Sequence, residues 1–287
     1  MTRIIYVNGR YLPYGQARVH AEDRGFQFAD AIYEVCEVRG GRLVDATRHL
    51  NRLARSLDEL KIAAPMTAAA CAQVLRETVR RNRVNNGMVY LQVSRGAGRR
   101  DFYFPPSHVR PTVVCLARSI SAARTEAAAA IGIAVKTMPD IRWGRCDIKT
   151  VMLLPAAMAK EAARAEDAKE AWLVDAAGYV TEGASSNAWI VDRDGRLVTR
   201  QIDSAILRGV TRSTLLDVLA QQGLEVVERP FTVAEAKAAR EAFVTSATNI
   251  VMPVVRIDGQ AIGNGVPGLL TLKLRADFHS SAEIAEG

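Results

Sequence analysis

The order of strand and helix patterns at the start of the chain is the feature that most constrains its fold. Strand-like segments at Ile4–Val7 and Ala31–Val38 come first. Two amphipathic helical patterns follow: one has leucines spaced three and four residues apart between positions 50 and 60, and the other is expected to start at an N-cap, Thr67. Strand patterns return at Met88–Arg95 and Thr112–Ala117. This order predicts an α+β domain with an antiparallel sheet.

A second set of patterns follows residues 119–130, a small, polar stretch without apolar periodicity that we interpret as an interdomain linker. Helices are expected over residues 150–165 and 209–222, the second ended by Gly223. Strands are predicted at Ile131–Lys136, Glu170–Val174, Tyr179–Thr181, Ala188–Val191, Leu224–Glu228 and Ala242–Ser246. We therefore predict two α/β domains, a small one over residues 1–118 and a larger one over residues 131–287.

Charge and length limit the classes of partner. The 287 residues suffice for two domains with real cores, and the formal net charge is +7, so a polyanionic partner must be considered. The basic residues are nearly all arginines, scattered singly or in pairs, and the densest group, in residues 76–83, has the spacing of one solvated helix face. No zinc-finger or RNA-recognition pattern occurs, so we expect no nucleic-acid partner.

Cysteine usage and the N-terminus indicate the compartment. The four cysteines form no Cys-x-x-Cys pair and are read as free thiols in a reducing compartment: Cys36, Cys71, Cys115 and Cys146. The N-terminal segment has no signal-peptide core, and the longest nearly apolar run, residues 127–135, is too short to cross a bilayer. We expect a soluble, cytoplasmic protein without a membrane partner.

Lys149 is the first candidate for chemistry. It ends the segment Arg145–Thr150 and precedes the apolar residues 151–154, so its surroundings are expected to be largely buried. A surface lysine at a strand end is the simpler interpretation, but the chain has only seven lysines. A buried amine loses its proton readily and can form a Schiff base with an aldehyde.

Glu182 is the second candidate. It lies in a segment of small residues and hydroxyls, Thr181–Asn187, where backbone and side chains can approach a bound anion closely. By itself it could be an ordinary turn carboxylate. Together with Lys149 it matches the needs of a pyridoxal-phosphate (PLP) enzyme, because a carboxylate can pair with the pyridinium nitrogen of that cofactor.

Other candidates are weaker taken singly. Residues 207–212 precede a helix, and helix N-termini bind phosphate through free N–H groups. Thr248 follows a strand among hydroxyl side chains, and Arg52 lies on the leucine-rich helix, where it is either a surface arginine or a phosphate ligand. The four histidines show no metal-ligand spacing, and neither Gly-x-Ser-x-Gly nor a dinucleotide-binding glycine pattern is present. We therefore expect no metal.

In their order along the chain these motifs resemble one family, the class IV (fold type IV) PLP-dependent aminotransferases. The resemblance covers essentially the whole chain and rests on these motifs: residues 22–28 (EDRGFQF), 33–35 (YEV), 49–53 (HLNRL), 142–149 (RWGRCDIK), 181–187 (TEGASSN) and 207–212 (LRGVTR). It implies an α/β subunit with the cofactor between two domains.

The resemblance also implies the cofactor ligands. Lys149 binds PLP covalently, Glu182 pairs with the pyridine nitrogen, and Arg52 binds the phosphate. The remaining cofactor contacts are assigned to Ser186, Leu207, Val210, Thr211 and Thr248.

Within the family, residues 142–149 look most like the D-amino-acid (D-alanine) transaminases, which bind the substrate carboxylate with a tyrosine, an arginine and a histidine. Tyr33 and Arg100 match the first two, whereas Phe102 stands at the position of the histidine. The implied reaction is ping-pong transfer of the amino group of a D-amino acid, such as D-alanine, to 2-oxoglutarate or pyruvate by a homodimer. A branched-chain L-amino-acid transaminase, an (R)-selective amine transaminase and a non-catalytic basic binding protein remain as alternatives.

Overall fold

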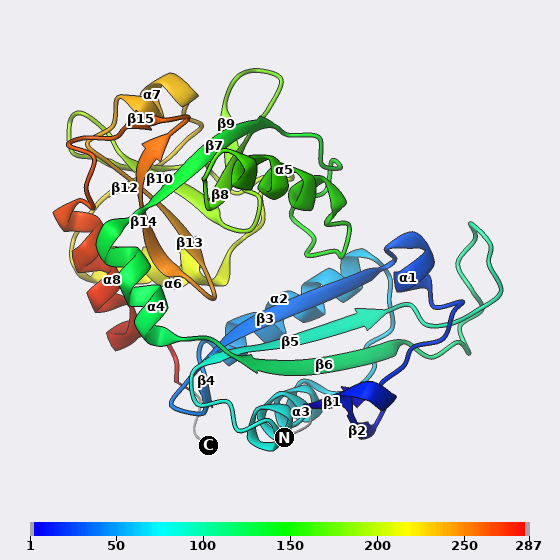
Figure 1. Ribbon diagram of the computed structural model, residues 1–287. Coiled ribbons are helices and arrows are strands. Elements are labelled where there is room, and N and C mark those ends of the chain that lie inside the picture. Colours follow the sequence, from blue (N-terminus) through cyan, green and yellow to red (C-terminus); the bar gives the residue numbers. More distant parts are fainter. Residues whose placement is uncertain (1–2, 285–287) are drawn as a thin grey trace. The chain divides into compact units, whose positions relative to one another are not determined.

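The computed structural model describes residues 3–284 and divides into two compact units (Figure 1). Unit 1 contains the described residues up to Ala122 together with Ile148–Met152 and residues 283–284, and unit 2 contains Ala123–Asp147 and Leu153–Ala282. The division differs from the continuous ranges expected from the sequence, because the segment that carries Lys149 belongs to unit 1. Residues 1–2 and 285–287, at the outer ends of the two predicted ranges, lie outside the described residues.

An antiparallel six-stranded sheet forms the centre of unit 1 and confirms the prediction for this part of the chain. Its strand order is β2-β1-β6-β5-β3-β4. The strands are β1 (Ile4–Val7), β2 (Arg10–Pro13), β3 (Ala31–Arg39), β4 (Arg42–Leu43), β5 (Gly87–Ser94) and β6 (Thr112–Ser119). Alternate residues of β3, among them Ile32, Glu34 and Cys36, are buried, while the intervening ones are half-buried. One face of this strand therefore enters the core.

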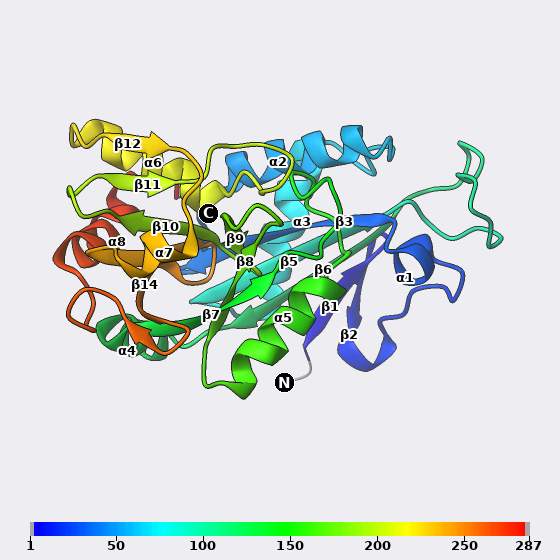
Figure 2. The same ribbon diagram turned by 90° about the horizontal axis from the view of Figure 1, so that it is seen from above.

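The two long helices of unit 1 cover one face of this sheet (Figures 1 and 2). They are α2 (Ala46–Glu59) and α3 (Ala68–Arg81); a short helix, α1 (Arg24–Phe28), and a 3-10 turn (Tyr14–Gln16) precede β3. In α2 the predicted leucine stripe faces inward, with Leu53 and Leu57 about 5% exposed or less. The Thr67 hydroxyl accepts a hydrogen bond from the Ala70 N–H at 3.2 Å, which confirms the predicted N-cap of α3.

A mixed nine-stranded sheet forms unit 2. Its order is β12-β11-β10-β13-β14-β7-β8-β9, and β15 pairs with β14. The strands are β7 (Ile133–Pro139), β8 (Glu170–Val174), β9 (Val180–Gly183), β10 (Asn187–Val191), β11 (Leu197–Thr199), β12 (Val226–Glu228), β13 (Glu241–Ser246), β14 (Ile250–Ile257) and β15 (Gln260–Ala261). A fully buried core lies on it, in which Trp172 meets Phe231 edge to face at 6.0 Å.

Among residues 3–284, five more helices complete the order of elements: α4 (Ala122–Ile131), α5 (Leu154–Ala165), α6 (Val210–Gln221), α7 (Val233–Lys237) and α8 (Leu269–Ser281). The interdomain linker predicted at residues 119–130 is helical for most of its length, because α4 occupies it, and the boundary between the two units, after Ala122, falls within it. Its alanines favour helix, and only Ala129 is buried, so no apolar stripe reveals it. The helix expected from residue 150 starts at Leu154. Gly223, with φ +68°, follows α6 as predicted.

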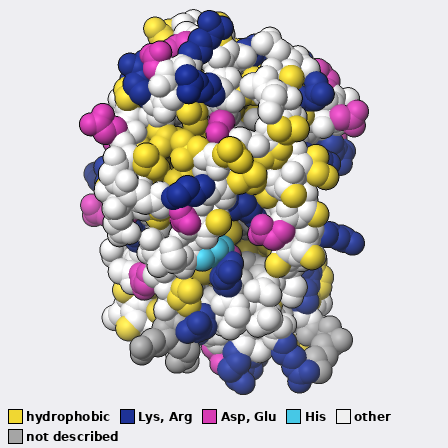
Figure 3. Space-filling model, turned by 90° about the vertical axis from the view of Figure 1, so that its left-hand side faces the viewer, with side chains coloured by type: hydrophobic (Ala, Val, Ile, Leu, Met, Phe, Trp, Pro, Cys, Tyr) yellow, Lys and Arg dark blue, Asp and Glu magenta, His cyan; other side chains and the backbone are white. Residues whose placement is uncertain are grey.

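The surface and helix lengths add two observations. On the face shown in Figure 3, Lys and Arg side chains lie among acidic and hydrophobic ones. No helix among residues 3–284 is both long enough and apolar enough to span a membrane.

Candidate active site

Lys149 is held along the first residues of β3 in unit 1. The Tyr33 N–H donates to the Lys149 carbonyl, and the Val151 N–H donates to the Ala31 carbonyl, both at 3.0 Å. The Lys149 Nζ donates to the Tyr33 Oη at 3.4 Å and lies 4.4 Å from the centroid of the Tyr33 ring. The structure therefore brings together the predicted cofactor lysine and one predicted substrate residue.

The surroundings of Lys149 are less buried than the sequence indicated. Ile148 and Thr150 are buried, and Lys149 itself is half-buried, but Met152 and Leu154 are 43% and 71% exposed. The expectation of a buried apolar stretch after Lys149 is therefore wrong. An isolated bridge between Ile32 and Thr150 joins this segment to the sheet, and the exposed residues Met152 and Leu153 follow it before α5 begins.

Two further polar residues lie beside Tyr33 that sequence reasoning missed. The ring of Tyr90 stacks on Tyr33 at 5.5 Å, and its hydroxyl donates to the Gln92 side chain at 2.6 Å. Burial, and then the neighbouring Tyr33, raise the pKa of Tyr90. The alternation of β5 was visible in the sequence, but only the β3–β5 register, which places Tyr33 opposite Gln92, shows that these side chains share a face.

Arg52 is held by a buried carboxylate. Its Nε and Nη2 donate to the Glu34 carboxylate at 2.7 and 2.8 Å, and the His49 Nδ1 lies 2.7 Å from the same carboxylate. Burial raises the pKa of Glu34, but Arg52 and His49 outweigh it and lower that pKa to about 2. Burial lowers the pKa of His49 more than Glu34 raises it. Glu34 is thus charged, the lowered pKa of His49 favours its neutral form, and the guanidinium plane is fixed.

The other predicted substrate residues lie on the loop after β5, also in unit 1. The Arg100 guanidinium lies 5.3 Å from the centroid of the Phe28 ring, and Phe102 meets the same ring edge to face at 5.8 Å. Both loop side chains are exposed, Phe102 to 81%. Arg100 and Phe102 are therefore neighbours that both contact the ring of Phe28.

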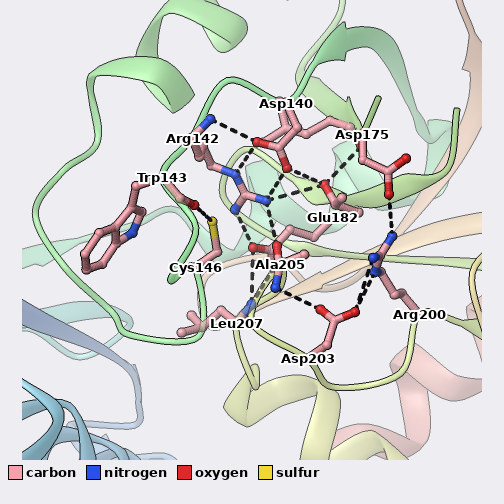
Figure 4. A network of polar contacts seen from close by, with 12 residues as sticks. Asp140, Arg142, Trp143, Cys146, Asp175, Glu182, Arg200, Asp203, Ala205 and Leu207 are labelled. Carbon is pink, nitrogen blue, oxygen red and sulfur yellow. Dashed lines mark hydrogen bonds and ion pairs between the residues drawn. The ribbon is translucent and has the colours of Figure 1, made fainter. Parts of the chain in front are cut away.

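Glu182 is the centre of a polar network in unit 2 (Figure 4). It lies in β9, not in a turn, and is 5% exposed. Its carboxylate accepts hydrogen bonds from the Arg142 guanidinium, from the Asn187 amide at 2.9 Å and from the Leu207 N–H at 3.2 Å. Leu207, predicted as a cofactor contact, therefore positions Glu182 through its backbone.

Arg142 joins Glu182 to a second carboxylate. Its guanidinium also donates to Asp140 at 2.7 Å and to the Ala205 carbonyl at 3.0 Å (Figure 4). Although burial lowers it, the pKa of Arg142 is raised by Asp140 and Glu182. One arginine thus faces two acidic side chains, and the formal net charge of these three side chains is −1. The motif that contains Arg142 was visible in the sequence, but its partner is 40 residues away.

The start of α6 fits the predicted phosphate contacts. Val210 and Thr211 are the first residues of this helix and are buried, and first-turn N–H groups have no partner within a helix. A Cβ at the N-cap, Gly209, would lie 2.0 Å from the Asn187 side chain, so any other residue there would displace Asn187. Asn187 thereby couples the helix start to Glu182.

The remaining two candidates lie elsewhere in unit 2. The Ser186 hydroxyl donates to the buried carboxylate of Glu170 at 3.1 Å. Thr248 lies half-buried in the turn between β13 and β14.

Comparison with known proteins identifies the family. The model for amino-transferase class IV matches residues 31–257. A D-alanine aminotransferase of Staphylococcus haemolyticus is 36% identical over 283 residues, which cover 99% of each chain. Among solved structures, the branched-chain amino acid aminotransferase of Escherichia coli has a TM-score of 0.87 at 22% identity and covers 98% of this chain and 94% of its own.

A hypothetical aminotransferase from Mycobacterium tuberculosis, solved in a PLP-bound form, has a TM-score of 0.83 at 22% identity and covers 97% and 98% of the two chains. These matches confirm the predicted α/β architecture of fold type IV. The chain belongs to the class IV aminotransferases.

Proposed function

We propose that this protein is a PLP-dependent transaminase that moves the amino group of D-amino acids, such as D-alanine, to a 2-oxo acid (2-oxoglutarate or pyruvate) by a ping-pong mechanism. The observation that carries the proposal is the match to a D-alanine aminotransferase over nearly the whole of both chains. Relatives from other staphylococci with the same name match at 34% identity over 97% of this chain.

The donor set fits the cofactor. In unit 2, the net negative charge of Asp140, Arg142 and Glu182 suits a protonated pyridine nitrogen, which donates a hydrogen bond to a carboxylate. The start of α6, with Val210 and Thr211, suits a phosphate. In unit 1, Lys149 supplies the amine for the aldehyde and Arg52 a fixed guanidinium for the phosphate. We assign further contacts to Ser186, Leu207 and Thr248.

Bound PLP supplies an aldehyde that captures amines and a protonated ring that accepts electrons. With the cofactor bound, the Lys149 Nζ would be the base that takes the proton from the substrate α-carbon. The Tyr33 hydroxyl, 3.4 Å from Nζ, keeps that amine oriented. Glu182, fixed by Arg142 and Asn187, stabilises the protonated ring.

The substrate carboxylate is assigned to Tyr33 and Arg100, beside the apolar ring of Phe102. Because this ring replaces a hydrogen-bond donor, it favours a second candidate function, an (R)-selective amine transaminase. We further propose a homodimer, in keeping with the family resemblance.

Substrate profiling of the holoenzyme tests the proposal. We expect amino transfer from D-alanine to 2-oxoglutarate or pyruvate to exceed transfer from L-leucine and from an uncharged (R)-amine. Preference for L-leucine would instead identify a branched-chain L-transaminase, and preference for the amine would identify an amine transaminase.

A further inference from the structure

A buried arginine outside the predicted site is hydrogen-bonded to the loop that carries Arg100. Arg24, at the start of α1, is 4% exposed. Its Nη1 donates to the carbonyl oxygens of Asp101 at 2.7 Å and Tyr103 at 3.3 Å. These carbonyls lie on either side of Phe102, and the first directly follows Arg100. One guanidinium thus holds the loop backbone at the predicted substrate residues.

The half-buried carboxylate of Asp30 fixes Arg24 in turn. The Arg24 Nε donates to Asp30 at 2.7 Å, and Asp30 also accepts two hydrogen bonds from Arg95 at 2.8 and 3.0 Å. Arg95 additionally donates to the carbonyls of Leu60 and Lys61. Turning Arg24 away from the loop would break its ion pair with Asp30 and leave the guanidinium of a residue that is 4% exposed without that partner, which is costly, so its contacts with the loop are rigid.

Phe28 connects Arg24 to Arg100 through its ring. It lies four residues after Arg24 in α1, and the two guanidinium groups lie 4.5 and 5.3 Å from its centroid. Phe102 touches the edge of the same ring. Both substrate-loop side chains therefore rest on a ring whose position depends on the helix that starts with Arg24.

The base of the loop is closed by the same residue. The Arg24 N–H donates to the Gly96 carbonyl at 2.9 Å. Gly96 has φ +102°, and a Cβ there would lie 2.2 Å from the Arg110 carbonyl, so the two ends of the loop are in close approach. The main chain and the side chain of Arg24 thus hold the loop at its base and near its tip.

From these contacts we infer that Arg24 is a positioning residue for substrate specificity: it holds the Arg100 loop in the shape that receives a carboxylate. The inference rests on the proposed function, in which Arg100 binds that carboxylate. A flexible loop loses conformational entropy each time it is ordered by a ligand, and this loss weakens binding. Because Arg24 already holds the loop in place, less entropy is lost when the substrate binds. Its loss should raise KM for amino acids and leave KM for an uncharged amine and kcat nearly unchanged.

The test uses Arg24→Lys in the full-length holoenzyme, with Arg81→Lys in α3 as the matched control. Hydrogen exchange of the peptide that covers residues 97–104 reports the loop directly, because the Gly98 and Tyr103 N–H groups are hydrogen-bonded there. We expect exchange about tenfold faster and KM for D-alanine about tenfold higher in Arg24→Lys, with the control like the wild type. Phe28→Leu, which removes the ring but no charge, should change both quantities in the same direction.

Unchanged exchange in Arg24→Lys would overturn the inference, as would faster exchange with an unchanged KM for D-alanine. If Arg24→Lys does not fold, the same two outcomes are scored on Phe28→Leu. Failure of the proposed function looks different: the wild type would not use D-alanine at all, while the exchange comparison would still show whether Arg24 holds the loop.

Discussion

Two buried carboxylates, Glu34 in unit 1 and Glu182 in unit 2, each face an arginine, but their charge balances differ. Glu34 is 3% exposed and Glu182 5%. Glu34 meets Arg52 and a histidine whose pKa is lowered, so this group is neutral overall. Glu182 shares Arg142 with Asp140, so that trio is negative.

The difference shows that a buried acid–arginine pair can serve two purposes. At Glu34 the negative charge of the carboxylate is balanced by Arg52, which it orients. The group of this pair that is available to bind a ligand is the fixed guanidinium. At Glu182 the positive charge of Arg142 is shared between two carboxylates. The two carboxylates therefore have one negative charge in excess, which can stabilise a cationic ring. We therefore expect substitutions at Glu34 to act mainly on stability and cofactor retention, and substitutions at Glu182 to act mainly on catalysis.

The largest loss of transamination is expected for substitution of Lys149, because neither Glu34 nor Glu182 can supply its amine. Lys149→Ala should fold and lose transamination by about a thousandfold or more, because the amine that captures the aldehyde and moves the proton is gone. Borohydride reduction of the holoenzyme followed by peptide mapping should place the cofactor on Lys149. Lys136→Ala, which removes a lysine paired with Glu166, is the control. Label on another lysine would refute the assignment.

The second-largest effect is expected for Glu182→Gln. This variant should retain the cofactor but lose transamination by about a hundred- to a thousandfold. The amide keeps the shape but removes the charge that holds the ring protonated. Single-turnover rates with D-alanine measure the loss, and Glu166→Gln in the exposed pair with Lys136 is the control. Rates near wild type would reduce Glu182 to a structural strand residue.

Glu34→Gln should act on stability. A carboxyl whose pKa falls from 4.5 to about 2 on folding stabilises the protein by about 3 kcal/mol above both values. This contribution is complete above pH 4.5 and is lost as the pH falls towards 2. Denaturant unfolding at pH 7 should therefore show the loss, and the difference from wild type should shrink below pH 4.5. A pH-independent difference would mean that packing, not charge, is responsible.

Arg100→Ala has the smallest expected effect but decides the substrate class. Loss of a charge-assisted hydrogen bond of about 1.5–3 kcal/mol lowers kcat/KM about ten- to a hundredfold for D-alanine. An uncharged (R)-amine should be little affected, because it has no carboxylate. Phe102→His should strengthen carboxylate binding by adding a donor. Equal losses on both substrates would assign Arg100 to loop support, with Arg99 as the next candidate for the clamp.

Local patterns predicted much of the fold. Ile4–Val7 and Glu170–Val174 are strands with the predicted ends, and Thr67 caps α3. The two strands are short, almost continuously buried runs, and α3 has a capping side chain, signals that lie within a few residues. By contrast, α4 lacks an apolar stripe, and it was missed for that reason.

The sequence by itself determined the order of part of the elements, among them the helices α2, α3, α5 and α6, and the identities of Lys149 and Glu182 as candidates. Only the tertiary structure decided their partners. Arg142 reaches Glu182 across 40 residues, and Arg24 reaches the Asp101 carbonyl across 77. The physical reason is that a buried charge is stable only with a partner, and which partner it meets depends on strand register and loop closure, not on neighbouring residues.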